Sequence, residues 1–270
     1  MGFEWQTLLL GVVQGITEFL PISSSGHLAL LQMFFGFSSP GLLTFDLILH
    51  CATVLAVLIF FRKDIALFLT QWSKGLWVKA ARDTEGWIYG WAVLAGTLVT
   101  AIIALPLKGM VEEAMLSRLA VGAGLLVTAG LLCIVPLLPE QQKNLSLKIA
   151  LAVGLAQGVA VFPGISRSGA TIAAALFMGL AAPEAFRLSF LMSVPAILGA
   201  SLLDGMKILR ESNLFLPVGW LPAAVAAFFL GWLSLAFLRR LVLSGKWAYF
   251  GIYCFLLGLA AIVSQVAMSF

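Results

Sequence analysis

Two short stretches of this chain combine glycine, serine and ionisable residues inside otherwise apolar sequence. Residues 11–28 read GVVQGITEFLPISSSGHL and residues 154–171 read GLAQGVAVFPGISRSGAT. Identical residues recur at Gly11/Gly154, Gln14/Gln157, Gly15/Gly158, Phe19/Phe162, Ile22/Ile165, Ser23/Ser166, Ser25/Ser168 and Gly26/Gly169. The copies differ at three chemically active positions, where Glu18, Ser24 and His27 correspond to Val161, Arg167 and Ala170. Such self-similarity indicates two related halves, whose diverged turns could complete one composite site.

The second copy has the character of an anion site. An unpaired arginine at membrane depth costs at least a few kcal/mol, so Arg167 needs an anionic partner. Its planar fork suits phosphate oxygens, and the flanking glycines expose backbone amides where the next helix starts. The residues predicted to bind a substrate phosphate are Ser23, Ser25, Gly164, Ser166, Arg167, Ser168, Gly169 and Thr171. The structural alternative is an Arg167–Glu18 pair that only joins the two copies.

The first copy offers acid and oxygen ligands. Gln14 and Glu18 are four residues apart, so both project from one helix face. Glu18 can bind a divalent cation or act as a general base, and Gln14 can add a neutral oxygen ligand. The predicted metal ligands are therefore Glu18 and, as the weaker candidate, Gln14. Because Gln157 mirrors Gln14, hydrogen bonding within the turn is an equal alternative for that glutamine.

The serine and histidine of the first copy supply a nucleophile and a base. An imidazole can accept a proton or attack phosphorus, and a serine needs only a nearby base to become nucleophilic. The predicted catalytic residues are Glu18, Ser24, His27 and Arg167. His50 lies four residues after Asp46, so these two are expected to satisfy each other in the core.

The rest of the chain is apolar enough to identify its solvent. Of 270 residues, 61% are hydrophobic and 10% are charged, and mean hydropathy is +1.07. Soluble domains carry about 25% charged residues, so the chain is predicted to be an integral membrane protein. Its net charge of +4 is modest and spread over loops, which gives no indication of nucleic-acid binding.

Six stretches are long enough to cross the roughly 30 Å of a bilayer core, which takes about 20 apolar residues. They are 43–61, 87–107, 116–138, 186–203, 217–238 and 247–270, three in each half. Both motif copies are cut by proline, glycine and serine after a dozen or so residues, which predicts re-entrant helical hairpins. Residues 62–85 are expected to form a polar surface loop. The fold class is thus all-α and polytopic, with six transmembrane helices plus two re-entrant hairpins.

An odd number of crossings separates the hairpins, so they should enter from opposite faces of a single membrane domain, residues 1–270. This is an inverted-topology repeat, with halves of approximately 1–140 and 144–270. One side collects Arg62, Lys63, Lys74, Lys79, Arg82, Lys143, Lys148, Arg239, Arg240 and Lys246, against Lys108, Arg118, Lys207 and Arg210 on the other. The richer side should be cytoplasmic, which places both termini and the opening of the first hairpin outside.

The motifs together resemble a known family. Residues 14–21 and 23–27, read with residues 163–171, closely resemble the undecaprenyl pyrophosphate phosphatase family of the bacitracin-resistance type. The resemblance extends over essentially the whole chain. It implies a bacterial inner-membrane hydrolase that removes the terminal phosphate of a long-chain isoprenyl pyrophosphate at the outer face. The product, undecaprenyl phosphate, is the lipid carrier of peptidoglycan synthesis.

The same resemblance places the acidic motif on Gln14 and Glu18, the serine-histidine segment on Ser24 and His27, and the arginine motif on residues 166–168 and Thr171. It implies a divalent cation, Mg²⁺ or Ca²⁺. Gln14 stands where many members have a second glutamate, and Ser25 where threonine is common. Attack by Ser24 with His27 as base is favoured over attack by His27. A lipid-phosphate transporter is the alternative function, and a homodimer is an open alternative to a monomer.

Overall fold

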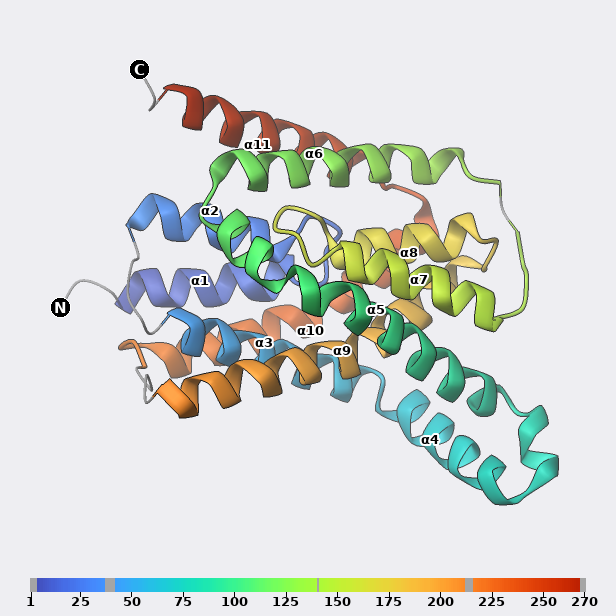
Figure 1. Cartoon of the computed structure of the whole chain (residues 1–270). Coiled ribbons are helices and arrows are strands. Elements are labelled where there is room, and N and C mark those ends of the chain that lie inside the picture. Colours follow the sequence, from blue (N-terminus) through green and yellow to red (C-terminus); the bar gives the residue numbers. More distant parts are fainter. Residues whose placement is uncertain (1–3, 37–41, 140, 212–215, 268–270) are drawn as a thin grey trace.

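The structure is a computed structural model, and it describes residues 4–36, 42–139, 141–211 and 216–267 (Figure 1). The elements are α1 (Glu4–Thr17), α2 (Ser24–Phe35), α3 (Leu42–Phe60), α4 (Arg62–Trp77), η1 (Lys79–Asp83), α5 (Glu85–Met115), α6 (Arg118–Ile134), η2 (Val135–Leu137), α7 (Leu147–Val159), α8 (Arg167–Phe177), α9 (Ala182–Glu211), α10 (Trp220–Ser244) and α11 (Ala248–Ala267). Within these residues the only β pairing is one isolated bridge between Lys143 and Leu180. The predicted all-α class is confirmed.

Long apolar helices dominate the bundle. Among the described residues, five helices are long and apolar enough to cross a membrane: α5, α6 continued by η2, α9, α10 and α11. Helices α3 and α4 qualify together as a sixth candidate, bent by 75° at their junction. Each predicted span falls on one of these helices, although Phe270 lies outside the described residues. The chain is therefore a polytopic helical membrane protein.

Both repeated motifs form short helical hairpins that point at each other. In Figure 1, α1 and α2 lie side by side at the end of the bundle near the N-terminus, and α7 and α8 lie side by side at the opposite end. We name their connections the first turn (residues 18–23) and the second turn (residues 160–166). The two turns meet in the middle of the bundle. Insertion of each hairpin as a re-entrant loop in a bilayer stays a prediction.

The repeated glycines position these hairpins. A Cβ atom on Gly11 would lie 2.3 Å from the Ala223 carbonyl oxygen of α10, and one on Gly154 would lie 2.4 Å from the Gly96 carbonyl oxygen of α5. Both contacts are closer than any side chain permits, so the entering helices α1 and α7 pack backbone to backbone on their neighbours. Small residues allow this close approach between membrane helices. Gly11 and Gly154, which correspond in the two copies, thus allow the same close helix packing in both halves.

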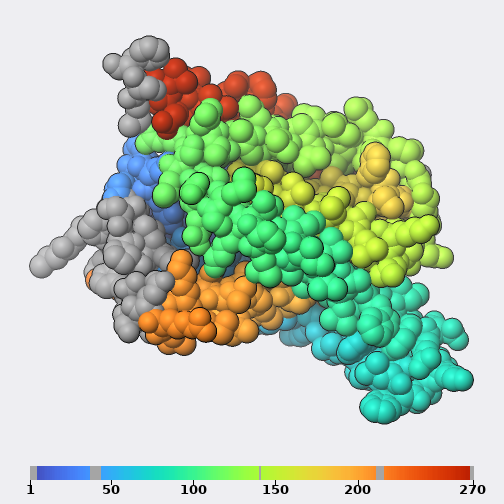
Figure 2. Space-filling view, viewed as in Figure 1, coloured from blue at the N-terminus to red at the C-terminus, as the bar shows by residue number. Residues whose placement is uncertain are grey.

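The expected loop at residues 62–85 is wrong in part, because most of it is helical. Helix α4 and the turn η1 follow α3, and Figure 2 shows this segment projecting from the body of the molecule. Helix α4 packs on α5 through Gly75, where an added Cβ would lie 2.3 Å from the Trp87 ring. Phe68 stacks on Tyr89 with ring centroids 4.4 Å apart. Gln71 adds a polar contact on the same face, since its Oε1 accepts from the Gly86 amide at 2.7 Å. The polar composition of the segment therefore concealed a helix that packs on α5.

Candidate active site

The first turn is strained at the residue that caps α2. Ser23 has φ 68°, and it is the sole non-glycine residue with positive φ in the described part of the chain. Its hydroxyl accepts a hydrogen bond from the Gly26 amide at 3.3 Å, and lies 3.3 Å from the Ser25 hydroxyl. Backbone strain of this kind costs about 1–3 kcal/mol and persists only where the surrounding structure enforces it. Here it starts α2 directly beside the second turn.

The first residues of α2 contact the second turn at a pair of glycines. A Cβ on Gly26 would lie 3.0 Å from the Gly164 Cα atom. Gly164 itself has φ 89°, and a Cβ there would lie 2.2 Å from the Val121 carbonyl oxygen of α6. Ser166 then caps α8, since its hydroxyl accepts from the Gly169 amide at 3.1 Å. The N-termini of α2 and α8 therefore both point into the junction, where their dipoles favour negative charge.

Glu18 is the centre of the junction. Its side chain is 2% exposed and takes hydrogen bonds on both carboxylate oxygens. Arg167 Nη2 donates to Oε1 across the two turns, and Ser24 Oγ donates to Oε2 at 2.5 Å. The structure therefore brings together three of the four predicted catalytic residues. The ion pair is also the contact that the structural alternative requires, so it does not by itself decide between the two interpretations.

Gln14 and His50 complete the surroundings of Glu18. Gln14 Nε2 donates to Glu18 Oε2 at 3.0 Å and to His50 Nδ1 at 3.1 Å. His50 Nδ1 also lies 3.7 Å from Glu18 Oε2. The expected Asp46–His50 hydrogen bond is not found, because the Asp46 carboxylate accepts from Gln32 of α2 at 3.0 and 3.2 Å. Residue type and spacing alone do not indicate these contacts of His50, since its partners are brought in by the packing of α1 on α3.

We name Gln14, Glu18, Ser24, His50 and Arg167 the Glu18 cluster. His27 lies outside it. Its Nδ1 is 2.7 Å from the Ser23 carbonyl oxygen, which can only accept, so Nδ1 carries a proton. Its Nε2 is 2.7 Å from the Tyr253 hydroxyl of α11, and the two rings stack 5.6 Å apart. Among the described hydrogen bonds, none joins His27 to Ser24, and the ionisable group that accepts from the serine hydroxyl is Glu18.

The predicted phosphate-binding hydroxyls mostly serve the turns themselves. Ser168 Oγ donates to the Leu20 carbonyl oxygen at 3.2 Å, which ties the second turn to the first. Thr171 Oγ1 donates to the Arg167 carbonyl oxygen at 2.8 Å and lies 2.6 Å from Ser189 Oγ of α9. The Ser166 hydroxyl caps α8 by accepting from the Gly169 amide. A phosphate-binding role for these residues stays a prediction, and their observed role is to hold Arg167 in place.

Thr128 of α6 is a residue that the sequence did not single out. Its hydroxyl donates to the Gly164 carbonyl oxygen at 2.8 Å and accepts from the Ser166 amide at 2.9 Å. It thereby satisfies two backbone groups of the second turn from a residue that is 1% exposed. Threonine on an apolar helix is common, so residue type alone did not distinguish it.

We expect Thr128→Val to destabilise the second turn. Valine keeps the shape but leaves a buried amide and carbonyl unpaired, at a cost of about 1–3 kcal/mol per unsatisfied group. Thermal unfolding of the purified protein in detergent measures the loss. Thr128→Ser is the matched control, because it restores the hydroxyl. Equal unfolding midpoints for the valine and serine variants would contradict this role.

A divalent cation fits the residues around Glu18. Gln14 Oε1 is buried and has no hydrogen-bond partner, although it lies beside a carboxylate and an imidazole. Gln157 Oε1 is unpartnered as well, but its amide nitrogen donates to Thr100, away from any acid. The described residues hold no group of three or more acidic, histidine or cysteine ligands. Mg²⁺ is commonly bound through one or two carboxylates plus substrate phosphates, so the Glu18 carboxylate, with the neutral oxygen of Gln14 beside it, could hold such an ion.

Comparison with known proteins gives the family of the chain. Residues 7–260 match the family model of the bacitracin resistance protein BacA. The undecaprenyl-diphosphatase of Desulfosudis oleivorans is 42% identical over 94% of this chain and 95% of its own length. That of Treponema denticola is 40% identical over 94% and 95%, and undecaprenyl-diphosphatase 2 of Halalkalibacterium halodurans is 36% identical over 94% and 93%. With matches along nearly its whole length, the chain belongs to the bacitracin resistance protein BacA family.

Proposed function

We propose that this chain is an undecaprenyl-diphosphatase, which hydrolyses undecaprenyl pyrophosphate to undecaprenyl phosphate and inorganic phosphate. The observation that carries the proposal is the Glu18 carboxylate, shared between the Ser24 hydroxyl and the Arg167 guanidinium where the two turns meet. A buried serine hydroxyl that donates to a carboxylate can act as a nucleophile, with the carboxylate as its base. The arginine that pairs with the same carboxylate can bind phosphate oxygens. The names of the family relatives support the substrate and the recycling of the lipid carrier.

The contacts favour Ser24 as the nucleophile. Ser24 Oγ attacks the terminal phosphorus, its proton passes to Glu18 Oε2, and the bond from phosphorus to the bridging oxygen breaks. Undecaprenyl phosphate leaves, and water then hydrolyses the phosphoserine, releasing inorganic phosphate and restoring the hydroxyl. Glu18 replaces His27 as the base in this scheme, because Ser24 donates to it at 2.5 Å. His27 is placed to orient groups at the edge of the site with Tyr253.

Charge stabilisation comes from Arg167 and from the N-termini of α2 and α8. Phosphoryl transfer depends chiefly on positioning and on neutralising the equatorial oxygens. A divalent cation on Glu18 and Gln14 would supply further Lewis-acid polarisation of a phosphoryl oxygen. Arg167 keeps 22% of its side chain exposed, which leaves part of its fork for an incoming phosphate.

The placement in the cell follows from the charge asymmetry of the loops. We assign the end of the bundle that carries the α3–α4 junction to the cytoplasm, and both termini and the opening of the first hairpin to the outer face of the inner membrane. The five residues of the Glu18 cluster can all be supplied by one copy of the chain. Assembly as a homodimer stays an open prediction.

The transporter alternative uses the same geometry for a different purpose. Helical hairpins that meet in mid-membrane also occur in secondary transporters, where a cationic pocket would bind a lipid phosphate. Transport alone, however, requires no serine held by a buried carboxylate, and the relatives are named as diphosphatases. Hydrolysis is therefore favoured.

A detergent assay tests the proposal without any membrane gradient. Purified full-length protein with Mg²⁺ or Ca²⁺ should release inorganic phosphate from undecaprenyl pyrophosphate. Chelation with EDTA should reduce release at least about a hundredfold, because metal polarisation of a phosphoryl oxygen contributes several kcal/mol. Ser24→Ala is the inactive control. Absence of release with either cation would overturn hydrolysis, and wild-type release by Ser24→Ala would overturn the assigned nucleophile.

A further inference from the structure

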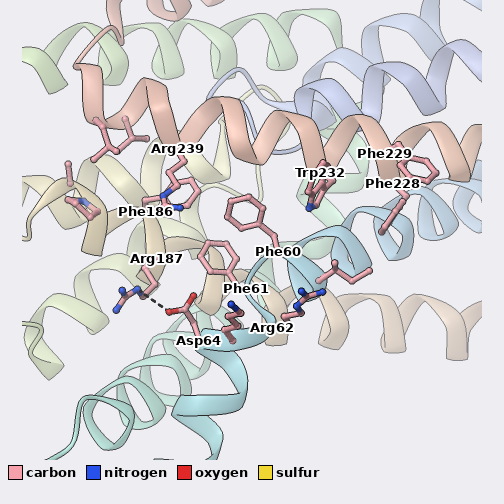
Figure 3. Close-up of a pocket in the computed structure, with 16 residues that line it drawn as sticks. Phe60, Phe61, Arg62, Asp64, Phe186, Arg187, Phe228, Phe229, Trp232 and Arg239 are labelled. Atoms are coloured by element: carbon pink, nitrogen blue, oxygen red, sulfur yellow. Dashed lines mark ion pairs between the residues drawn. The ribbon is translucent and has the colours of Figure 1, made fainter.

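A second site lies away from the Glu18 cluster, in a groove at the corner between α3 and α4. The groove has a volume of about 720 Å³ and is bounded by this corner, the start of α9 and the second half of α10. Figure 3 shows α10 along one side, carrying Phe228, Phe229, Trp232 and Arg239, and the α3–α4 corner opposite. None of its lining residues belongs to the Glu18 cluster. The groove therefore needs an explanation of its own.

The walls of the groove are aromatic and face outward. On α10, Phe229 is 58% exposed and Trp232 is 42% exposed, while Phe186 of α9 is buried. The α10 lining consists of Phe228, Phe229 and Trp232 and, about two turns further on, Arg239, Val242 and Leu243. Apolar side chains on both sides of a cation suit the chain of a lipid rather than a small free ion. The first requirement for a lipid site is met.

The groove also presents unpaired positive charge. Arg62, Lys63 and Arg239 line it, all three are exposed, and none has an ion pair in the described part of the chain. Arg187 is different, because it donates to Glu85 at 2.6 Å and lies 3.5 Å from both Asp64 and Glu184, so its charge is already paired with carboxylates. The unpaired cations of the groove are therefore Arg62, Lys63 and Arg239. Basic pockets between membrane helices recognise phosphorylated lipid headgroups.

We propose that this groove binds an anionic bilayer phospholipid, with its phosphate held by Arg62, Lys63 and Arg239 and one chain along the aromatic wall of α10. A zwitterionic lipid would offer the same chain but lacks the net charge that matches three cations. A free phosphate would match the charge but would leave the apolar side chains of α10 on either side of Arg239 uncovered. The lipid is separate from the substrate, and its binding does not depend on hydrolysis.

A buried aromatic stack separates this groove from the Glu18 cluster. Phe61 and Phe186 form its floor, with ring centroids 6.1 and 4.8 Å from that of Phe190. Phe190 in turn lies 5.7 Å from Phe19, the residue that follows Glu18. This packing closes the inner end of the groove. A lipid bound there would stabilise the folded protein by mass action without entering the active site.

Native mass spectrometry of the full-length protein in detergent tests the proposal, with phosphatidylglycerol as anionic probe and phosphatidylcholine as neutral probe. Wild type should prefer phosphatidylglycerol by about tenfold to a hundredfold, from three cations near one headgroup. Arg62→Gln, Lys63→Gln and Arg239→Gln combined should abolish this preference. The matched control combines Lys74→Gln, Lys79→Gln and Arg240→Gln, which removes the same charge from exposed residues outside the groove.

The outcomes separate this proposal from the catalytic one. Retention of the preference in the control and in Ser24→Ala supports a distinct lipid site, whatever the hydrolysis assay yields. Equal binding of both lipids by wild type would overturn it, as would an unchanged preference in the groove triple variant. Displacement of the bound lipid by glycerol phosphate at equal concentration would also overturn it, because a headgroup alone would then account for the affinity.

Discussion

Arg167→Lys should lose about 10³-fold or more in turnover, the scale on which an arginine that stabilises phosphoryl transfer contributes. Lysine keeps the charge but is a point donor, so it cannot hold Glu18 and also offer a second fork position to a phosphate oxygen. Arg167→Ala should lose at least as much. Steady-state phosphate release from undecaprenyl pyrophosphate in detergent measures both, with kcat and KM separated to locate the loss in the transition state.

The control for the exchange of arginine for lysine is Arg240→Lys, an exposed substitution of the same type outside both sites. It should keep wild-type turnover. Near-normal turnover by Arg167→Lys and Arg167→Ala together would refute the phosphate-binding role and leave the arginine as a purely structural partner of Glu18.

Glu18→Gln should affect both stability and hydrolysis. Glutamine preserves the shape but leaves the Arg167 guanidinium without its counterion, and breaking a buried pair this way costs about 3–5 kcal/mol. Loss of the base beside Ser24 should also lower turnover by about 10²–10⁴-fold. Thermal unfolding in detergent reports the first effect, and phosphate release reports the second.

The double variant Glu18→Gln with Arg167→Gln distinguishes the two interpretations of this ion pair. Removing both charges eliminates the uncompensated cation, so unfolding should return toward the wild-type midpoint. Hydrolysis should stay lost, because neither the base nor the phosphate ligand is restored. A double variant that recovers stability and turnover together would mean that the pair serves only to join the turns.

The sequence predicted much of the fold because membrane solvation leaves few alternatives. Each predicted span lies on a long helix, since a backbone in lipid must satisfy its own hydrogen bonds. The polar segment 62–85 was misjudged, because the apolar stripe of α4 is short and its partner α5 could not be inferred from local pattern. The spacing of His50 from Asp46 indicates the wrong partner for that histidine, and the residue type of Thr128 indicates no role. The contacts of both depend on which backbone or side chain the packing brings beside them.

What the sequence by itself determined is the membrane class, the two polar turns and the residue types in them, because composition and repetition are properties of the chain alone. Only the tertiary structure decided that Ser24 and Arg167 meet on one carboxylate, and that Glu18 rather than His27 lies beside the serine hydroxyl. The physical reason is distance along the chain. Glu18 and Arg167 are brought together by glycine-mediated packing of α1 on α10 and of α7 on α5, which fixes where the two turns stop.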